Sequence, residues 1–296
     1  MKNVHFLRVP EDADAIAKKS AGAEVVIVGS SFIGMEVASV ISKAAKKISV
    51  IGMEKVPFER VLGVQLGKAM KEWHELKSEG KISWYMEAVV SEILTDEDLS
   101  VKEVVLKDGT RLPCTLCVIG AGVVPATQFI QQTGDVKIEP RDFSVLVDGK
   151  MHAGNELYAG GDIARYKFHL SGDSVRIEHY GMAQFHGRIA ALNMLGKNVE
   201  CNNIPFFWTT QYGKSLRYCG HALRFDDVLI DGDFSPAVFK FVAYFCEGDK
   251  VVAAASVERD PAVAIVAELL NAGQMFSKQQ LKEELEKGKI SLHGRL

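Results

Sequence analysis

Residues 24–37 read E-V-V-I-V-G-S-S-F-I-G-M-E-V, and this stretch decides the fold. The short apolar run at 24–28 is typical of a buried parallel strand. A helix is expected directly after it, because apolar residues then recur at helical spacing, at Ile33, Val37 and Ile41. A buried strand that leads through glycines into a helix is the first half of a β-α-β unit.

The turn between strand and helix, residues 29–34, has the pattern G-x-S-x-x-G. It is a variant of the glycine fingerprint that holds the pyrophosphate of a dinucleotide at a helix N-terminus. Gly29 makes the tight turn, and Gly34 lets helix and strand pack closely. Ser31 stands at the middle position, where its small hydroxyl side chain can contact phosphate. The alternative is a tight strand–helix connection without a ligand.

The surrounding sequence extends this unit into a doubly wound α/β domain. We expect a β-α-β-α-β unit, then two antiparallel strands that turn at Asp108-Gly109, then a buried return strand. The expected strands are 48–51, 82–86, 88–94, 101–107 and 116–119, and the expected helix is 62–78.

The acid that would bind the ribose of the dinucleotide is less clear in the sequence. Glu54 lies at a suitable distance after the glycines, but Gly52 occupies the position directly after the second strand. Lys55 and Arg60 stand further along, so the sequence shows no arginine placed for a 2′-phosphate. The pattern favours NADH over NADPH. Glu54 as an ordinary solvated loop acid is the alternative.

A second turn of interest lies at 155–166, N-E-L-Y-A-G-G-D-I-A-R-Y, with Asp162 after an apolar strand end. A helix is expected around 180–195 and strands at 238–245 and 250–255. Two helix starts are marked by caps: Asp260 as N-cap with Pro261 in the first turn, and Ser277 with Gln280 as a capping box. The sequence therefore predicts a connector (1–20), a dinucleotide-binding domain (21–120), a further segment that contains the second turn (121–199) and a C-terminal α+β domain (200–296).

Composition excludes several classes of protein. Of the 296 residues 47% are hydrophobic and 25% charged, and the net charge is -3, which gives no reason to expect a nucleic-acid partner. The sequence predicts no membrane span and no targeting signal. Five scattered cysteines argue for a reducing compartment, and the histidines show no metal-ligand spacing. Neither Cys114-x-x-Cys117 nor Cys219-Gly-His221 supports a redox or cluster site.

Several stretches together resemble the pyridine nucleotide-dependent flavoprotein reductases, most closely the apoptosis-inducing factor branch. They are V-V-I-V-G-S-S-F-I-G-M-E-V-A, C-V-I-G-A-G-V-V-P-A-T, E-L-Y-A-G-G-D-I-A, I-E-H-Y-G-M-A-Q-F-H-G-R-I-A-A and I-P-F-F-W-T…Y-G-K-S-L-R-Y-C-G. The resemblance implies an α/β fold with NAD(P)H- and FAD-binding domains, 121–199 being the C-terminal part of the latter. It also implies hydride transfer from NADH to FAD and on to an unknown acceptor.

Roles for individual residues follow from the same resemblance. For NAD(P)H it implies Phe32 and Glu36 beside the nicotinamide, with Gly120 and Gly122 in the cofactor-binding turn after the return strand. For FAD it implies Asp162 at the ribityl chain, the segment Glu178, His179 and Tyr180 at the pyrimidine edge, and Trp208 in the same cleft. Three of these residues have a simpler alternative: Phe32 as core, His179 as a surface helix residue and Trp208 as filler between domains.

The resemblance also implies an ADP-binding half of the FAD domain upstream, which we expect this chain to lack. An alternative function follows: a non-enzymatic NAD-binding or interaction protein with a role in apoptosis or redox signalling. Phe206, Phe207 and the strand from Phe239 to Phe245 raise the possibility of a homodimer, although we expect most of these aromatic side chains in the core. The family suggests a mitochondrial or cytoplasmic location.

Overall fold

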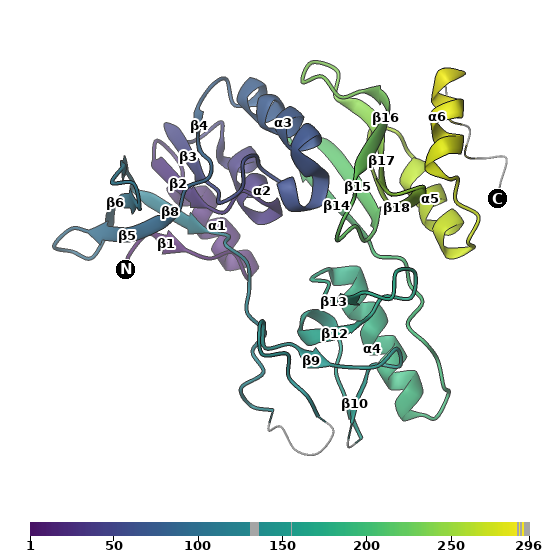
Figure 1. Cartoon of the computed structure of the whole chain (residues 1–296). Coiled ribbons are helices and arrows are strands. Elements are labelled where there is room, and N and C mark those ends of the chain that lie inside the picture. The colour runs from purple at the N-terminus through teal and green to yellow at the C-terminus, as the bar shows by residue number, and fades with distance from the viewer. Residues whose placement is uncertain (131–135, 155, 289, 291, 293–296) are drawn as a thin grey trace. The chain divides into compact units, whose positions relative to one another are not determined.

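The computed structural model describes residues 1–130, 136–154, 156–288, 290 and 292 (Figure 1). The chain divides into two compact units. The first comprises Met1–Gly122, Thr209–Leu216 and Gly232–Phe241, and the second comprises Val123–Trp208, Arg217–Asp231 and Val242–Leu296. Among the described helices, none combines the length and the apolar character that crossing a membrane requires.

A five-stranded parallel sheet forms the centre of the first unit. Its hydrogen-bonded order is β1 (Val4–His5), β8 (Leu116–Ile119), β2 (Glu24–Val28), β3 (Lys47–Ile51) and β4 (Ile82–Tyr85). Helices α2 (Phe32–Ile41) and α3 (Glu59–Lys77) connect β2 to β3 and β3 to β4, as the apolar periodicity predicts. The order confirms the α/β doubly wound fold, because parallel neighbours joined by helices define that class.

The first twenty residues are more than the expected connector. They contain β1, which extends the sheet through the pair Val4–Cys117, and helix α1 (Pro10–Lys19). The Asp12 carboxylate accepts hydrogen bonds from the N–H groups of Arg8 and Val9, which fixes the start of α1. The strand was missed because two residues give no periodicity to read.

A three-stranded antiparallel sheet interrupts the parallel one in the chain order. It consists of β5 (Val90–Thr95), β6 (Val101–Leu106) and β7 (Arg111–Pro113), paired in sequence order. The expected turn at Asp108-Gly109 is confirmed: Gly109 has a positive φ of 88°, and the Asp108 side chain accepts the Thr110 N–H at 2.9 Å. The third strand was not predicted.

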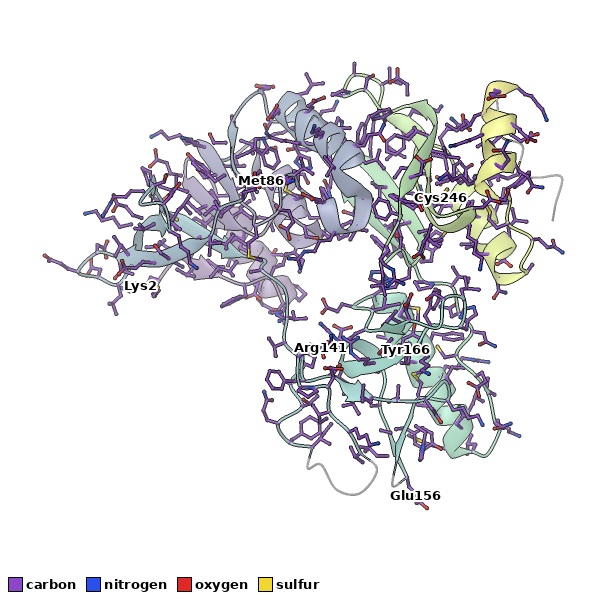
Figure 2. The ribbon with its side chains drawn as sticks, in the orientation of Figure 1. Lys2, Met86, Arg141, Glu156, Tyr166 and Cys246 are labelled. Atoms are coloured by element: carbon purple, nitrogen blue, oxygen red, sulfur yellow. The ribbon has the colours of Figure 1, made fainter. Side chains whose placement is uncertain are left out.

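Short strands and one long helix make up residues 136–200 of the second unit. The strands are β9 (Val145–Leu146), β10 (His152–Gly154), β11 (Leu157–Tyr158), β12 (Ala164–Lys167) and β13 (Ser174–Val175), with a 3-10 turn at Gly161–Ile163. Helix α4 (Tyr180–Met194) covers them, and Tyr166, Phe168, Ile177 and Ile189 lie in their shared core. Figure 2 labels Tyr166, one of the largest buried side chains, on β12.

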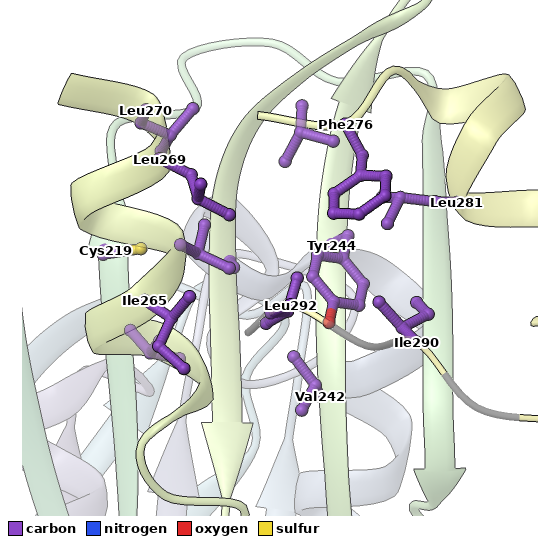
Figure 3. Close-up of a cluster of buried hydrophobic side chains, with 14 of the residues drawn as sticks. Cys219, Val242, Tyr244, Ile265, Leu269, Leu270, Phe276, Leu281, Ile290 and Leu292 are labelled. Atoms are coloured by element: carbon purple, nitrogen blue, oxygen red, sulfur yellow. The ribbon is translucent and has the colours of Figure 1, made fainter. Parts of the chain in front are cut away.

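A second five-stranded sheet follows, in the order β14 (Phe206–Gln211), β15 (Lys214–Gly220), β18 (Lys250–Val257), β17 (Lys240–Glu247) and β16 (Asp227–Asp233). Helices α5 (Ala262–Asn271) and α6 (Lys278–Glu286) contribute Val266, Leu269 and Leu281 to the cluster around Tyr244 (Figure 3). Burial of apolar side chains from strands and helices together explains why the region forms a core of its own.

The aromatic side chains of β17 and of Phe239, directly before it, do not form an exposed face. Phe239, Phe241 and Phe245 are each at most 1% exposed, so they serve as core residues and not as the dimer surface considered above.

One of the two predicted caps in this region is wrong. Pro261, not Asp260, is the N-cap of α5, and the Asp260 carboxylate instead pairs with Arg217 at 2.7 Å. The other is confirmed: Ser277 accepts the N–H of Gln280, whose side chain accepts the N–H of Ser277. The Asp260 carboxylate binds an arginine on β15, whereas Ser277 and Gln280 bind each other.

Candidate functional site

The glycine turn of the first unit is built for close backbone approach. Gly29 has a positive φ of 115°, and a Cβ at this residue would lie 2.3 Å from the carbonyl oxygen of Gly120. A Cβ at Gly34 would lie 2.0 Å from the carbonyl oxygen of Gly29. No larger residue fits at either position, so β2, β8 and the start of α2 meet at glycines as the fingerprint requires.

Helix α2 presents its N-terminus at this turn without a side-chain cap. Ser31 is the N-cap residue, in extended conformation, and its exposed hydroxyl makes no capping hydrogen bond. The first turn of α2 also contains no acidic residue. Uncapped N–H groups and the positive end of the helix dipole attract an anion, so the local geometry fits a pyrophosphate.

The loop after β3 explains the missing acid and corrects one prediction. A Cβ at Gly52 would lie 2.3 Å from the Ser30 hydroxyl, so no acid fits directly after the strand. Glu54 lies two residues on and pairs with Arg60, Nε to Oε1 at 2.7 Å. Arg60 is therefore not remote, as the sequence suggested, because the start of α3 brings its guanidinium to Glu54. A carboxylate and a guanidinium thus share the position expected for ribose recognition.

Phe32 and Glu36 lie on the first turns of α2. The Phe32 ring is half-buried and packs edge-on against Phe58, with 5.1 Å between ring centroids. The Glu36 carboxylate, also half-buried, accepts a hydrogen bond from Thr209 Oγ1 at 2.5 Å. Gly122 follows Gly120 beyond β8, with a positive φ of 94° and open space around it. These residues, with the glycine turn, belong to one compact unit.

In the second unit, Asp162 lies in the 3-10 turn after β11, and its side chain is exposed. The turn is fixed from α4: the N–H of Gly161 donates to His186 Nδ1 at 3.2 Å. His186 is fully buried, and burial lowers its pKa to about 4, which keeps the ring neutral and able to accept.

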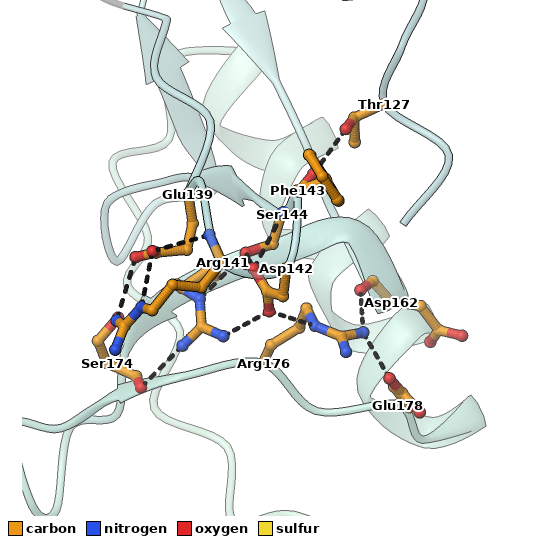
Figure 4. A network of polar contacts seen from close by, with 11 residues as sticks. Thr127, Glu139, Arg141, Asp142, Phe143, Ser144, Asp162, Ser174, Arg176 and Glu178 are labelled. Carbon is orange, nitrogen blue, oxygen red and sulfur yellow. Dashed lines mark hydrogen bonds and ion pairs between the residues drawn. The ribbon is translucent and has the colours of Figure 1, made fainter. Parts of the chain in front are cut away.

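An ion-pair network ties this turn to the segment before α4 (Figure 4). Arg176 donates to the Asp162 carbonyl oxygen at 3.1 Å and pairs with Glu178 at 2.5 Å and Asp142 at 2.9 Å. Burial raises the pKa of Asp142, but hydrogen bonds from Ser144 and two arginines outweigh it and hold the pKa well below its usual range. Asp162 and Glu178, distant in sequence, are thus held by one guanidinium.

The start of α4 combines a half-buried ring with exposed aromatic side chains. His179 is the N-cap residue; its ring lies 4.4 Å from that of Phe207, and burial, with His221 nearby, lowers its pKa to about 4. Tyr180 is 77% exposed, and its hydroxyl accepts from Gln184. Trp208, on β14, is 64% exposed. As at α2, no side-chain hydrogen bond caps this helix.

Sequence reasoning missed several residues that hold these groups. Thr209 on β14 and His186 on α4 stand in the quoted stretches but were given no role, and Gln211, His74 and Arg176 stand outside them. Thr209 lies 173 residues from its partner Glu36, and His74 lies 137 residues from Gln211. Nothing in the local sequence marks these residues as partners of the site, because their contacts form only in the fold.

The cysteines lie in the interior of the part of the chain that the structure describes. All five cysteines are free and buried, and the adjacent Cys114 and Cys117 are 1% and 0% exposed. Within those residues no three His, Cys, Asp or Glu side chains gather as metal ligands.

Comparison with known proteins assigns the chain to a family. Residues 1–187 match the pyridine nucleotide-disulphide oxidoreductase family, whose members use FAD and NAD(P)H, and residues 206–287 match the reductase C-terminal domain. The chain is 39% identical to human apoptosis-inducing factor 3 over 285 residues, which cover 95% of the chain and 46% of that protein. It therefore spans about half the length of this relative.

Solved structures agree with the fold. The putidaredoxin reductase of a covalent putidaredoxin reductase–putidaredoxin complex superposes with a TM-score of 0.82 at 26% identity, covering 91% of this chain and 63% of that one. A ferredoxin reductase from Rhodopseudomonas palustris superposes with a TM-score of 0.86 at 24% identity, covering 98% and 70%. With its glycine cradle, its sheet order and these matches, the chain belongs to the pyridine nucleotide-disulphide oxidoreductase family.

Proposed function

We propose that this chain carries the nicotinamide-binding part and a portion of the flavin-binding part of an NAD(P)H-dependent flavoprotein oxidoreductase. The observation that carries the proposal is the cradle of Gly29, Gly34 and Gly120 beneath the uncapped N-terminus of α2. Side chains are excluded there and an anion is attracted, which is what a dinucleotide pyrophosphate needs. The bound nicotinamide and flavin supply the chemistry, transfer of a hydride and then of electrons.

The first unit would bind NADH. Ser31 and the backbone of the glycine turn, with Gly120 and Gly122 beside it, would hold the pyrophosphate. Glu54 would accept hydrogen bonds from the ribose hydroxyls. Phe32 would stack near the nicotinamide, and Glu36 would accept a hydrogen bond from its carboxamide, because an ionised carboxylate is an acceptor only.

The second unit would contribute to FAD binding. Asp162 would bind the ribityl chain, and the backbone N–H groups following Glu178, His179 and Tyr180 would face the pyrimidine edge of the flavin. Those N–H groups stabilise negative charge, which the reduced flavin carries. His179 would act as a neutral group there, since its pKa is about 4. Trp208 would present its exposed ring to the same cofactor.

The electron acceptor is proposed as a small electron-carrier protein. The support is the similarity to the reductase whose solved structure is a complex with putidaredoxin. A mitochondrial location and a role in apoptosis stay predictions that rest on the similarity to apoptosis-inducing factor 3.

The visible spectrum tests this function. The purified chain is incubated with excess FAD, freed of unbound cofactor, and then treated with NADH without oxygen. A retained flavin band that bleaches on addition of NADH is the expected result. A chain that binds NADH by calorimetry but retains no flavin would instead support the alternative, a nucleotide-binding protein without redox activity of its own.

A further inference from the structure

A line of buried polar side chains leads away from Glu36 within the first unit. Thr209 Oγ1 lies 2.5 Å from Glu36 Oε1, Gln211 Nε2 lies 3.1 Å from Thr209 Oγ1, and His74 Nε2 lies 2.7 Å from Gln211 Oε1. Thr209, Gln211 and His74 are 3%, 2% and 0% exposed. Buried polar groups are costly unless they bind each other, so this line is held together by its own hydrogen bonds.

The chemistry of the groups fixes the direction of every bond. The Gln211 amide oxygen can only accept, so His74 Nε2 carries the proton and donates. The Gln211 amide nitrogen can only donate, so Thr209 Oγ1 accepts it and gives its own proton to Glu36. Burial lowers the pKa of His74 to about 4, which keeps the ring neutral with a single N–H. All donors therefore point toward the carboxylate, and each bond strengthens the next.

The far end of the line is held rigidly by aromatic rings. The His74 ring packs edge-on against Tyr212 and Trp84, with 5.0 Å and 6.3 Å between centroids. Within the described residues, His74 Nδ1 is buried without a hydrogen-bond partner. An apolar side chain at this position would avoid that cost, so packing alone does not explain a histidine there.

We propose that Thr209, Gln211 and His74 are positioning residues that orient the Glu36 carboxylate toward the carboxamide of the nicotinamide. The inference rests on the proposed function, which places a nicotinamide beside Glu36. Thr209 occupies Oε1, and no hydrogen bond between described residues occupies the second carboxylate oxygen. Holding one oxygen fixes the plane of the carboxylate and aims the other at an incoming amide N–H.

The test compares two ligands that differ only where Glu36 acts. NADH carries the nicotinamide, and ADP-ribose has the same pyrophosphate and riboses without it. Thr209→Val removes the hydroxyl and keeps the shape, so it is expected to weaken NADH binding by about 5- to 20-fold while ADP-ribose binding stays unchanged. Thr209→Ser keeps the hydroxyl and is expected to bind both ligands as the unaltered chain does.

A second comparison isolates Glu36. In a Glu36→Ala background the line has no carboxylate to orient, so Thr209→Val is expected to have no further effect on NADH binding. The thermal unfolding midpoint of each variant shows whether it folds. If Thr209→Val does not fold, Gln211→Met breaks the same line one residue further from Glu36 and is expected to show the same selective loss.

The outcomes separate this inference from the proposed function. Equal weakening of NADH and ADP-ribose, or a loss that persists in the Glu36→Ala background, would mean that Thr209 has only a structural role. Unchanged binding of both ligands by Thr209→Val would overturn the inference and leave the proposed function intact. If the unaltered chain bound neither ligand, the proposed function would fail and the inference with it.

Discussion

The pair formed by Glu54 and Arg60 makes a sharp prediction about the choice between NADH and NADPH. Glu54→Gln removes the negative charge that would face the ribose in the proposed complex and frees the guanidinium that now lies 2.7 Å from it. The amide still accepts a hydrogen bond, so the ribose contact is weakened but not abolished. The released Arg60 can then pair with a 2′-phosphate, for which its forked geometry is suited.

The magnitude follows from the charges. Two unit charges about 5 Å apart interact by about 1 kcal/mol in water and about 3 kcal/mol at an effective dielectric constant of about 20. The Glu54 side chain is 23% exposed and that of Arg60 73%, so solvent screens the site and the low end applies. A relief of about 1 kcal/mol shifts the ratio of the two dissociation constants roughly 5-fold toward NADPH.

Calorimetric titration of NADH and NADPH into both proteins measures that ratio directly. Glu72→Gln, which makes the same charge change on an exposed residue of α3, serves as the control and should leave the ratio unchanged. A ratio that Glu54→Gln also leaves unchanged would refute the reasoning, because Glu54 would then face solvent and not the ribose.

Two further predictions concern stability. Because the folded-state pKa of His74 is about 4 and its ordinary value is 6.5, the unfolded chain binds more protons between these values. The contribution of His74 to the free energy of unfolding should fall by up to about 3 kcal/mol as pH drops from 6.5 to 4. His74→Phe should remove that contribution from the slope in urea titrations, while His179 and His186, whose pKa values are also about 4, keep theirs. Ser277→Ala removes half of a capping box and should lower the free energy of unfolding, measured by urea titration, by about 1 kcal/mol. An unchanged urea midpoint would contradict this and show that the start of α6 is already frayed.

The sequence predicted the framework well because strong local signals encode it. The buried run before Gly29, the helical spacing after it and the turn at Asp108-Gly109 all agree with the structure. The prediction missed two short strands, because β1 and β7 have only two and three residues and form by pairing with other strands of their sheets. The N-cap predicted at Asp260 was wrong because its carboxylate pairs with Arg217, which lies far from it in sequence.

Only those residues of the candidate site that lie in recognisable sequence motifs could be predicted. The glycine turn and Asp162 stand in recognisable stretches, but the groups that hold them come from elsewhere. Thr209 lies 173 residues from Glu36 and His74 lies 137 residues from Gln211. Single-sequence reasoning has no access to contacts of that separation, because nothing in local composition marks which polar residue the fold will bury beside which other.

The central claim is that the turn at 29–34 holds a dinucleotide pyrophosphate, and one calorimetric titration of NADH tests it. It compares the unaltered chain with Ser31→Asp. Aspartate is a good N-cap, so α2 should stay as stable or gain up to about 1 kcal/mol. Its charge would face the pyrophosphate, so NADH should bind at least about 10-fold more weakly.

Ser171→Asp adds the same charge on an exposed loop of the second unit and should bind NADH like the unaltered chain. We expect saturable binding of NADH that only Ser31→Asp weakens. Binding that Ser31→Asp leaves intact, or no binding to the unaltered chain, would contradict it.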